Sequence, residues 1–365
     1  MAAKLLLLGL AGICSCFYWV YDTSTFPQTV YTGIPVADGL LNRLVGLHLP
    51  IYNANPALSI HGITVQGSIN AAWVLALVEG YRRSDQGTVS IPILILMALL
   101  RQLPTGLSIS IYCAIHLFVS ITARNPTKQN LIVPRAVRYI LPVVLLTSYI
   151  VPAAAVFYPV SSEMEKNLQL IWPFWPAFTS AFIFAVNLIP APTSNTEPDL
   201  TANDVGREYT RSLRCLYTVT FLAAAAPHLI WLLKLFASLP MGKSIVPSSV
   251  QGLLSSVPCL YQSPWELALG DNVQGLLAWE YLAVSAGLFV WAGSLHGKVD
   301  PLNYGVVAMV ILLTGPMGAA VDFIWARDEI VTRRAEAGMS FVKGRPRGGS
   351  GMGKWNRGMK VLALD

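Results

Sequence analysis

Five charged residues lie inside stretches of the chain that are otherwise apolar. The most isolated is Glu280, which sits within the run LLAWEYLAVSAGLFVW with no basic residue nearby. The other four are Glu79, Arg101, Lys234 and Asp322. An apolar environment disfavours the charged form of a carboxyl group, so such a group keeps its proton near neutral pH and can donate it. The pattern therefore indicates general acid catalysis on an apolar substrate.

The three acids differ in their local surroundings. Glu79 precedes Arg82 and Arg83 by three and four residues, so an ion pair along a helix is the alternative to a functional role. Asp322 is followed by Arg327, with which an interfacial pair is the corresponding alternative. Glu280 has no such partner. We therefore predict Glu280 as the general acid, with Asp322 and Glu79 as second carboxylates that hold the proton or accept it at the end of the reaction.

Aromatic residues occur close to the same stretches. Trp279 and Tyr281 flank Glu280, and Tyr112 lies in an apolar run that also contains His116. Aromatic faces attract cations, and the attraction strengthens when water is excluded. These rings would therefore stabilise a carbocation, although interfacial belts are the alternative use of Trp and Tyr in membrane proteins. The predicted substrate-binding residues are Arg101, Tyr112, Trp279, Tyr281 and His116, with Arg101 tuning the acidity of the carboxyl groups.

The composition is that of a membrane protein. Hydrophobic residues make up 54% of the 365 residues and charged residues only 12%. A soluble domain carries about 25% charged residues, so a soluble fold of this size is disfavoured. The mean hydropathy of +0.54 agrees with this interpretation.

Eight stretches are long and apolar enough to cross a bilayer, which takes about 20 residues. We predict an all-α, polytopic integral membrane bundle of about eight transmembrane helices. The third stretch is too long for one straight span and contains Pro104, so its helix should be kinked or broken near that residue. The predicted spans are 4–21, 64–81, 90–122, 138–158, 168–190, 213–236, 274–295 and 303–325.

Alternation of eight spans would bring the five charges to one side of the bilayer. The second, sixth and eighth spans would end there, and the third and seventh would start there. Glu79 and Glu280 would then share a polar chamber closed at its far end. Basic residues near the membrane divide almost equally between the two sides, so the positive-inside rule hardly decides the orientation. The basic C-terminal tail favours cytosolic termini.

The chain divides into a membrane part and a tail. We predict a transmembrane helical domain over 1–325 and a basic, disordered tail over 326–365, which contains KGRPRGGSGMGKWNRGMK. Such a tail favours contact with anionic lipid over nucleic acid. The first span is followed by FYWVY, an aromatic anchor, and is expected to be retained rather than cleaved.

The sequence lacks the motifs that several classes of membrane enzyme require. There is no DxxD or DDxxD pair to hold a magnesium diphosphate, no HxxH cluster and no CxxC. We therefore predict no metal and no cofactor. A transporter or receptor-like binding protein remains an alternative, and His116 or His228 leaves a membrane-bound O-acyltransferase open. His228 follows Pro227, so we expect it to satisfy a carbonyl that this proline frees.

Three stretches carry a resemblance to a known family. They are DGLLNRLVGLHLP (38–50), LRQLPTGLSISIYCAIHL (100–117) and WEYLAVSAGLFVWA (279–292). In this order, over most of residues 35–325, the sequence resembles the fungal ascI-type membrane-bound terpene cyclases. The family pattern has a proline before a Leu-Tyr pair, where this chain has Ser110, Ile111 and Tyr112.

The resemblance implies a reaction and a setting. The expected reaction is metal-independent cyclisation of a polyprenyl or prenylated aromatic substrate, as in meroterpenoid and other secondary-metabolite biosynthesis. It would start with protonation of an epoxide or terminal alkene. The expected partners are a lipophilic isoprenoid substrate, the lipid bilayer, and the upstream prenyltransferase and epoxidase of the same pathway. We expect a multi-pass protein that is located in the endoplasmic reticulum membrane.

Overall fold

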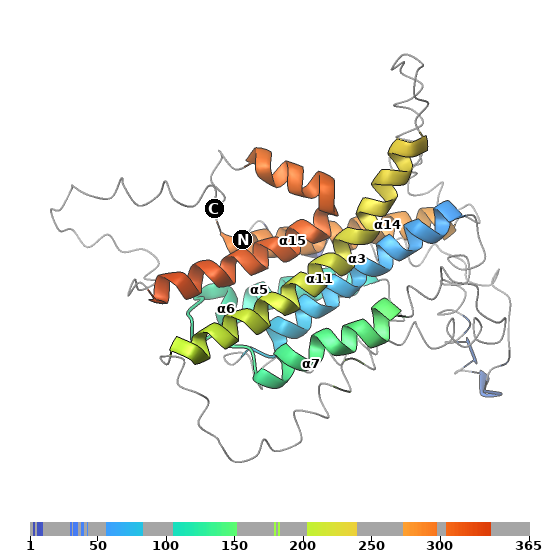
Figure 1. Ribbon diagram of the computed structural model, residues 1–365. Helices are drawn as coiled ribbons and strands as arrows, with labels where there is room; N and C mark the ends of the chain where they lie inside the picture. The colour runs from blue at the N-terminus through green and yellow to red at the C-terminus, as the bar shows by residue number, and fades with distance from the viewer. Residues whose placement is uncertain are drawn as a thin grey trace.

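The computed structural model of the protein is helical throughout the part of the chain that it describes (Figure 1). The described residues are 56–82, 105–151, 203–238, 273–297 and 304–336, with short pieces within 3–42 and at 179 and 182. Over these residues the predicted all-α fold is confirmed, because every assigned element is a helix.

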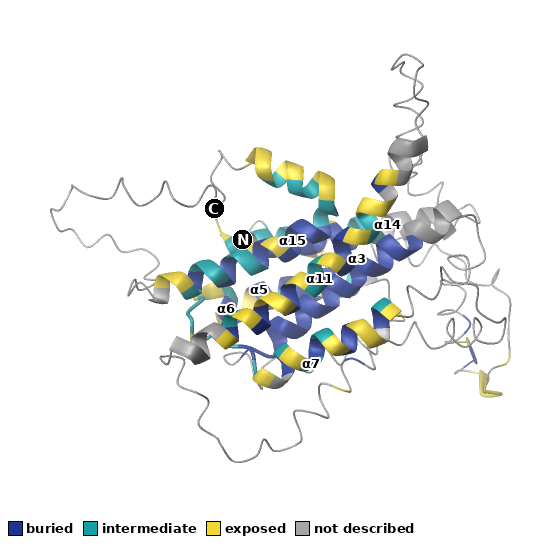
Figure 2. Ribbon diagram, in the orientation of Figure 1, coloured by how far each residue is buried: buried dark blue, intermediate teal, exposed yellow. Residues whose placement is uncertain are grey.

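Helix α3 (Pro56–Gly80) is the centre of the bundle. All residues from 62 to 82 are buried, so the helix is covered on every face (Figure 2). Apart from Glu79 its sequence carries no acidic or basic residue other than a histidine, which suits this position. Gly67 allows a close helix crossing, since a Cβ there would lie only 2.6 Å from the carbonyl oxygen of Ala223.

The crossing partner at Gly67 is helix α11 (Asn203–Ser238), which lies alongside α3 in Figure 1. It runs in the opposite direction, because Ala223 lies near Gly67 whereas the earlier Tyr217 lies near Arg82. Helix α7 (Arg135–Leu145) and the π-helical turn η2 (Leu146–Ile150) follow one another, and α7 packs on the start of α11.

Helix α5 (Thr105–Val119) runs in the same direction as α3. Its Tyr112 hydroxyl donates a 3.1 Å hydrogen bond to the carbonyl of Ala76, and one turn later His116 reaches Glu79. The short helix α6 (Ile121–Arg124) follows, capped by Ser120. Residues 83–104, which include the kink or break predicted near Pro104, lie outside the described residues.

Helix α14 (Val273–His296) packs against α3, α5 and α15. It also runs parallel to α5, because Gly287 lies against Ser110 and the later Trp291 bonds to His116. The ends of α3, α5 and α14 therefore lie at the same end of the bundle. The strict alternation predicted for eight spans is wrong here, since it would place the ends of α3 and α14 on opposite sides.

Helix α15 (Tyr304–Glu336) turns sharply at Gly315, where φ is 74° and ψ is 165° (Figure 1). That conformation is accessible almost only to glycine. The next residue, Pro316, has no N–H, so it leaves the carbonyl of Leu312 without its helical donor. His228 Nε2 supplies the missing bond at 3.2 Å. His228 thus serves a carbonyl freed by Pro316 and not, as expected, one freed by Pro227.

The predicted domain boundary falls inside α15. This helix continues through residue 325 to Glu336, and both Arg327 and Asp328 are buried in the bundle. The correction has a physical cause: Ile324 and Val331, seven residues apart, are both buried, so the apolar face continues past the predicted boundary. Residues 337–365, where disorder was predicted, lie outside the described residues.

Two helical stretches within the described ranges are long and apolar enough to cross a membrane, Glu208–Ile230 and Tyr304–Arg334. Two shorter apolar helices are Gly106–Val119 and Tyr281–His296. The second long stretch contains the turn at Gly315 and is therefore not one straight rod. The predicted spans at 4–21 and 168–190 lie almost wholly outside the described residues.

Candidate functional site

Four charged side chains meet inside the bundle where α3, α5 and α14 end. Glu79 and Arg82 come from the end of α3, and Arg327 and Asp328 from α15. Their side chains are 0%, 0%, 2% and 4% exposed, respectively. We call them the charge network, and the end of the bundle that holds them the network end.

Each arginine of the charge network bridges both acids. Arg82 donates from Nε to Glu79 at 2.9 Å and from a terminal nitrogen to Asp328 at 2.7 Å. Arg327 donates to Glu79 at 2.6 Å and, through two nitrogens, to Asp328 at 3.1 and 2.9 Å. Two positive and two negative charges therefore cancel. This balance is what permits four charges to be buried together, because an unpaired buried charge is strongly destabilising.

Neighbouring groups complete the pairing around Arg82. Its other terminal nitrogen donates to the carbonyl of Leu131 at 2.5 Å, and the Tyr217 hydroxyl donates to Asp328 at 2.7 Å. Burial by itself would lower the pKa of the Arg82 guanidinium. Asp328 and Glu79 outweigh burial and hold that pKa well above its usual value, so Arg82 stays charged.

The second oxygen of Glu79 faces an aromatic cluster. It accepts a 3.0 Å hydrogen bond from the Thr122 hydroxyl, and His116 Nε2 lies 3.6 Å away. Trp291 donates to His116 Nδ1 at 3.1 Å, so the hydrogen of a neutral His116 is on Nε2, facing Glu79. The rings of Tyr112, His116 and Trp291 have centroids 5.4 to 6.3 Å apart. Carboxylate and aromatic faces are thus combined in one buried site.

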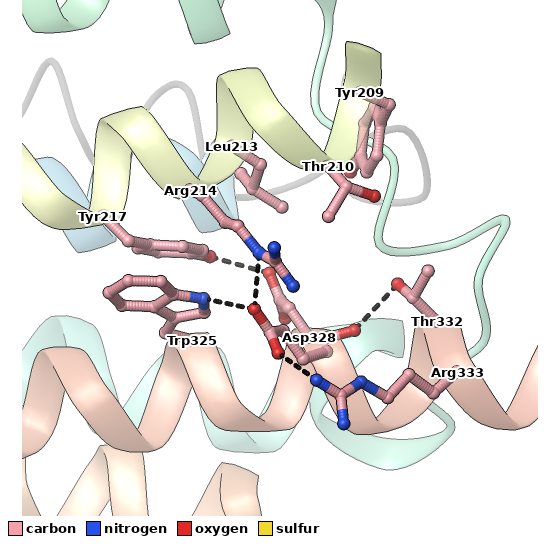
Figure 3. A pocket seen from close by; sticks show the side chains of 10 residues that line it. Tyr209, Thr210, Leu213, Arg214, Tyr217, Trp325, Asp328, Thr332 and Arg333 are labelled. Atoms are coloured by element: carbon pink, nitrogen blue, oxygen red, sulfur yellow. Dashed lines mark hydrogen bonds and ion pairs between the residues drawn. The ribbon is translucent and has the colours of Figure 1, made fainter. Parts of the chain in front are cut away.

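A cleft of about 120 Å³ opens beside the charge network, between the start of α11 and the end of α15 (Figure 3). Tyr217 stacks on Trp325, with ring centroids 6.1 Å apart, and its hydroxyl points to Asp328. At the rim, Glu329 accepts from Arg214 at 2.9 Å and from Trp325 at 2.8 Å. Ligand pockets usually enclose about 300 to 1,000 Å³, so this cleft admits water or a small group and not a whole polyprenyl chain.

The structure separates the acids that the sequence grouped together. Glu79 lies in the charge network, whereas Asp322 is exposed on α15 near His296. Glu280 lies in α14, eleven residues before Trp291, which places it about 16 Å along the helix axis from the level of His116. The prediction placed Glu280 and Glu79 at one end of the bundle, whereas the backbone of Glu280 lies toward the opposite end, because α14 runs parallel to α3.

The predicted substrate-binding residues divide in the same way. Tyr112 and His116 lie beside Glu79. Tyr281 lies far from them: its hydroxyl is 3.2 Å from where a Cβ on Gly315 would be. The side chains of Trp279 and Glu280, and all of Arg101, lie outside the described residues.

Sequence reasoning missed much of the site. The sequence spacing indicates Arg327 only as a partner of Asp322, and Asp328 falls in the predicted tail. Tyr217 and Thr122 carried no signal of their own, because their partners are distant in the sequence. A usable signal was present for α15, since the spacing of buried apolar positions continues past residue 325.

The family of the chain follows from a family model, the CtvD domain, which matches residues 5–332. The chain belongs to the CtvD-domain family. Terpene cyclase ascI of Acremonium egyptiacum is 23% identical over 95% of this chain and 97% of its own length. Terpene cyclase sdgD of Emericella nidulans is 24% identical over 84% of this chain and 82% of its own length.

A third curated relative agrees with these two. Terpene cyclase ctvD of Aspergillus terreus is 22% identical over 80% of this chain and 83% of its own length. No solved structure gives a significant match. The predicted resemblance to ascI-type cyclases is confirmed, and this CtvD-domain protein is an enzyme of the terpene cyclase type.

The structure also bears on where a metal could bind. Within the described ranges, no group of three or more His, Cys, Asp or Glu side chains is arranged to hold a metal ion. The acids of the charge network are instead occupied by two arginines. The absence of a metal in the reaction stays a prediction, tested below with a chelator.

Proposed function

We propose that this CtvD-domain protein is an integral membrane terpene cyclase that works without a metal ion. Its substrate is a polyprenyl or prenylated aromatic molecule of a meroterpenoid or related secondary-metabolite pathway. It protonates a terminal epoxide or alkene of that substrate, and the carbocation then closes the rings. The observation that carries the proposal is the match to three curated terpene cyclases over 80% or more of this chain.

Two acids are assigned opposite roles in this reaction. Glu280 is the proton donor, because its stretch of α14 offers no nearby cation that would hold it ionised. Glu79 is the acceptor of the final proton, because Arg82 and Arg327 keep it as a carboxylate. Their separation along the bundle would let one end of a long substrate be protonated while the other end loses a proton.

The remaining predicted residues support these two places. Tyr112 and His116 would stabilise cationic charge near Glu79, and Trp279 and Tyr281 would do so near Glu280. Two assignments stay open to test by substitution, Asp322 as a second acid and Arg101 as a residue that tunes the carboxyl groups.

The setting of the proposed reaction is the bilayer. A substrate of this kind dissolves in lipid and would enter the bundle from the membrane. The protein would be a multi-pass protein of the endoplasmic reticulum, acting after a prenyltransferase and an epoxidase. The two candidate spans and the apolar composition support membrane insertion.

Microsomes from yeast expressing the full chain test the function directly. They are incubated with a farnesylated phenol or its terminal epoxide, with and without EDTA, and the products are separated by chromatography. Cyclic product that persists in EDTA is the expected result. Activity that EDTA removes and added Mg²⁺ restores would contradict the metal-independent reaction. No cyclic product from either substrate, at normal expression, would contradict the proposed substrate class.

Acid variants test the assigned roles. Glu280→Gln should abolish product, and Glu79→Gln should lower it at least tenfold, because each removes a proton-handling carboxylate. Glu208→Gln is the matched control: Glu208 is exposed, contacts Tyr139 and Arg135, and should leave activity unchanged. Normal cyclisation by Glu280→Gln would show that Glu280 is not the donor.

The alternative functions lose their support. The relatives are enzymes of the terpene cyclase type, which disfavours the transporter. The hydrogen bonds of the two histidines disfavour an acyltransferase: His116 accepts from Trp291, and His228 donates to the carbonyl of Leu312. His228→Ala should therefore leave the reaction class unchanged, and any loss should accompany a lower melting temperature.

A further inference from the structure

A polar stripe runs along the central helix. Gln66, Asn70 and Trp73 lie at positions i, i+4 and i+7 of α3, so they share one face. Asn70 is 0% exposed and Trp73 is 4% exposed. Neither the amide of Asn70 nor the indole N–H of Trp73 has a hydrogen-bond partner in the part of the chain that the structure describes.

Unpaired polar groups are costly in such a place. Buried amides and indoles are paired in the great majority of structures, and each exception calls for an explanation. The cost is highest where lipid or apolar side chains replace water. Leucine or phenylalanine would fill the same space without this cost. The unpaired groups of Asn70 and Trp73, called the pair below, are therefore best explained by a ligand that supplies the missing hydrogen-bond partner.

The level of the pair along the bundle fits the proposed reaction. Asn70 is nine residues before Glu79, so it lies about 13 Å from the charge network along α3. Glu280 lies about 16 Å from the same level along the parallel helix α14. The backbone positions of Asn70 and Glu280 are thus at similar heights, on two helices that pack against each other.

The chemistry of the pair selects the ligand group. The Asn70 amide and the Trp73 indole both offer N–H donors, so an oxygen acceptor suits them. Neither is charged, and the basic side chains that the structure describes all belong to helix ends or loops at the network end. Among the described side chains, a diphosphate would find no counter-ion at this level. The matching group is a neutral oxygen, as in an epoxide, hydroxyl or carbonyl.

We propose that Asn70 and Trp73 form a binding site for a neutral oxygen atom of the isoprenoid substrate. The two N–H groups hold this oxygen at the level of Glu280, and the carbon chain extends from there toward the charge network. The site thus distinguishes oxygenated isoprenoids from plain hydrocarbons. This inference rests on the proposed cyclase function, of which it specifies the substrate class.

Binding measurements test the site without requiring turnover. The purified full-length protein in detergent is titrated with three probes: the terminal epoxide of a farnesylated phenol, the farnesylated phenol itself, and farnesylbenzene, which has no oxygen. Ligand-induced shifts of the melting temperature report affinity. Comparison of the three probes shows whether the epoxide or the phenol oxygen is recognised.

Three variants make the test specific. Asn70→Leu and Trp73→Phe each remove a donor without adding a polar group. Each should weaken binding of the recognised oxygenated probe about tenfold or more and leave farnesylbenzene binding nearly unchanged. Ser68→Ala is the matched control, because Ser68 is buried on the same helix but donates to its own helix at the carbonyl of Thr64. It should retain the parent preference.

Each outcome decides the inference. If Asn70→Leu melts higher than the parent and binds each of the three probes as tightly as the parent does, Asn70 is only an unpaired group and the proposal is overturned. If Asn70→Leu does not fold, Trp73→Phe decides by the same comparison. Probe discrimination without any cyclic product would support this site and contradict the cyclase function. Cyclic product without discrimination between the probes would support the cyclase function and contradict this site.

Discussion

At the scale of single residues, Arg82 shows most clearly how the network end is built. It touches both acids of the charge network and the carbonyl of Leu131, so it joins α3, α15 and the segment before α7. The charges cancel only while both arginines are present. Removal of one arginine leaves a buried carboxylate without its counter-ion, which is far more costly than the loss of an exposed pair.

Arg82→Met should therefore destabilise the protein by about 3–5 kcal/mol, measured as a lower melting temperature in detergent. Arg214→Met is the control, because Arg214 forms an ion pair with Glu329 that is half exposed at the arginine. Its effect should stay within about 1 kcal/mol. Equal effects of the two substitutions would show that the charge network is not a buried ion-pair site.

At the scale of helices, two glycines decide how the elements meet. Gly67 lets α3 and α11 approach until the backbone of Ala223 occupies the space of a side chain. Gly315 lets α15 reverse direction, which brings its carbonyl at Leu312 to His228 and its turn to Tyr281. Both glycines are needed because they lack a side chain, so substitution by alanine, which adds a methyl group, tests both roles.

Gly67→Ala should destabilise the protein by about 1–3 kcal/mol, because the new Cβ would lie 2.6 Å from a backbone oxygen that cannot move aside. The matched control is Gly293→Ala in α14, where a Cβ would meet nothing within 4 Å. That variant should be unchanged or up to about 1 kcal/mol more stable, since alanine favours a helix. Thermal unfolding of both variants measures the difference.

Gly315→Ala should cost about 1–3 kcal/mol, because only glycine adopts its backbone conformation without strain. The variant should also lower cyclase activity, since the added methyl group would lie 3.2 Å from the hydroxyl of Tyr281, the residue that follows Glu280 on α14. Gly305→Ala, in open space on the same helix, is the control for melting temperature and product yield. A melting temperature equal to that of the control would contradict the assigned strain.

At the scale of the whole molecule, the basic side chains that the structure describes collect at the network end. The predicted alternation of spans divides the basic residues almost equally between the two sides of the membrane. It places Arg82 on one side and the segment that contains Lys128 on the other. The structure instead joins Arg82 to the carbonyl of Leu131 in that segment. The described basic side chains at this end are Arg82, Arg124, Lys128, Arg135, Arg138, Arg211, Arg214, Arg327, Arg333 and Arg334.

For a protein inserted in the membrane as proposed, the positive-inside rule then assigns the network end to the cytosol. Lys128→Cys, introduced into a cysteine-free variant, should react with an impermeant maleimide on sealed microsomes, whose outer face is cytosolic. Labelling before permeabilisation is the expected result. Labelling only after permeabilisation would reverse the orientation, and release of the protein by alkaline carbonate would contradict insertion itself.

The sequence determined the class of elements and the family. A long apolar stretch with few charges satisfies all its backbone hydrogen bonds within the segment when it forms a helix, which suits surroundings of lipid or apolar side chains. The three quoted stretches were enough to indicate an ascI-type terpene cyclase. Local spacing offered an ion pair of Glu79 with an arginine three or four residues later as the alternative to a functional role, and the structure shows the Glu79–Arg82 pair.

Only the tertiary structure decided which charges meet. The parallel directions of α3, α5 and α14 follow from how helices pack, and no local spacing encodes that choice. Those directions separated Glu280 from Glu79 and brought His116 to Glu79 instead. The Arg82–Asp328 pair joins residues 246 positions apart, so it formed only when two helices with individually unremarkable sequences were packed together. Burial makes this pairing necessary, because a charge removed from water is strongly destabilising unless an opposite charge pairs with it.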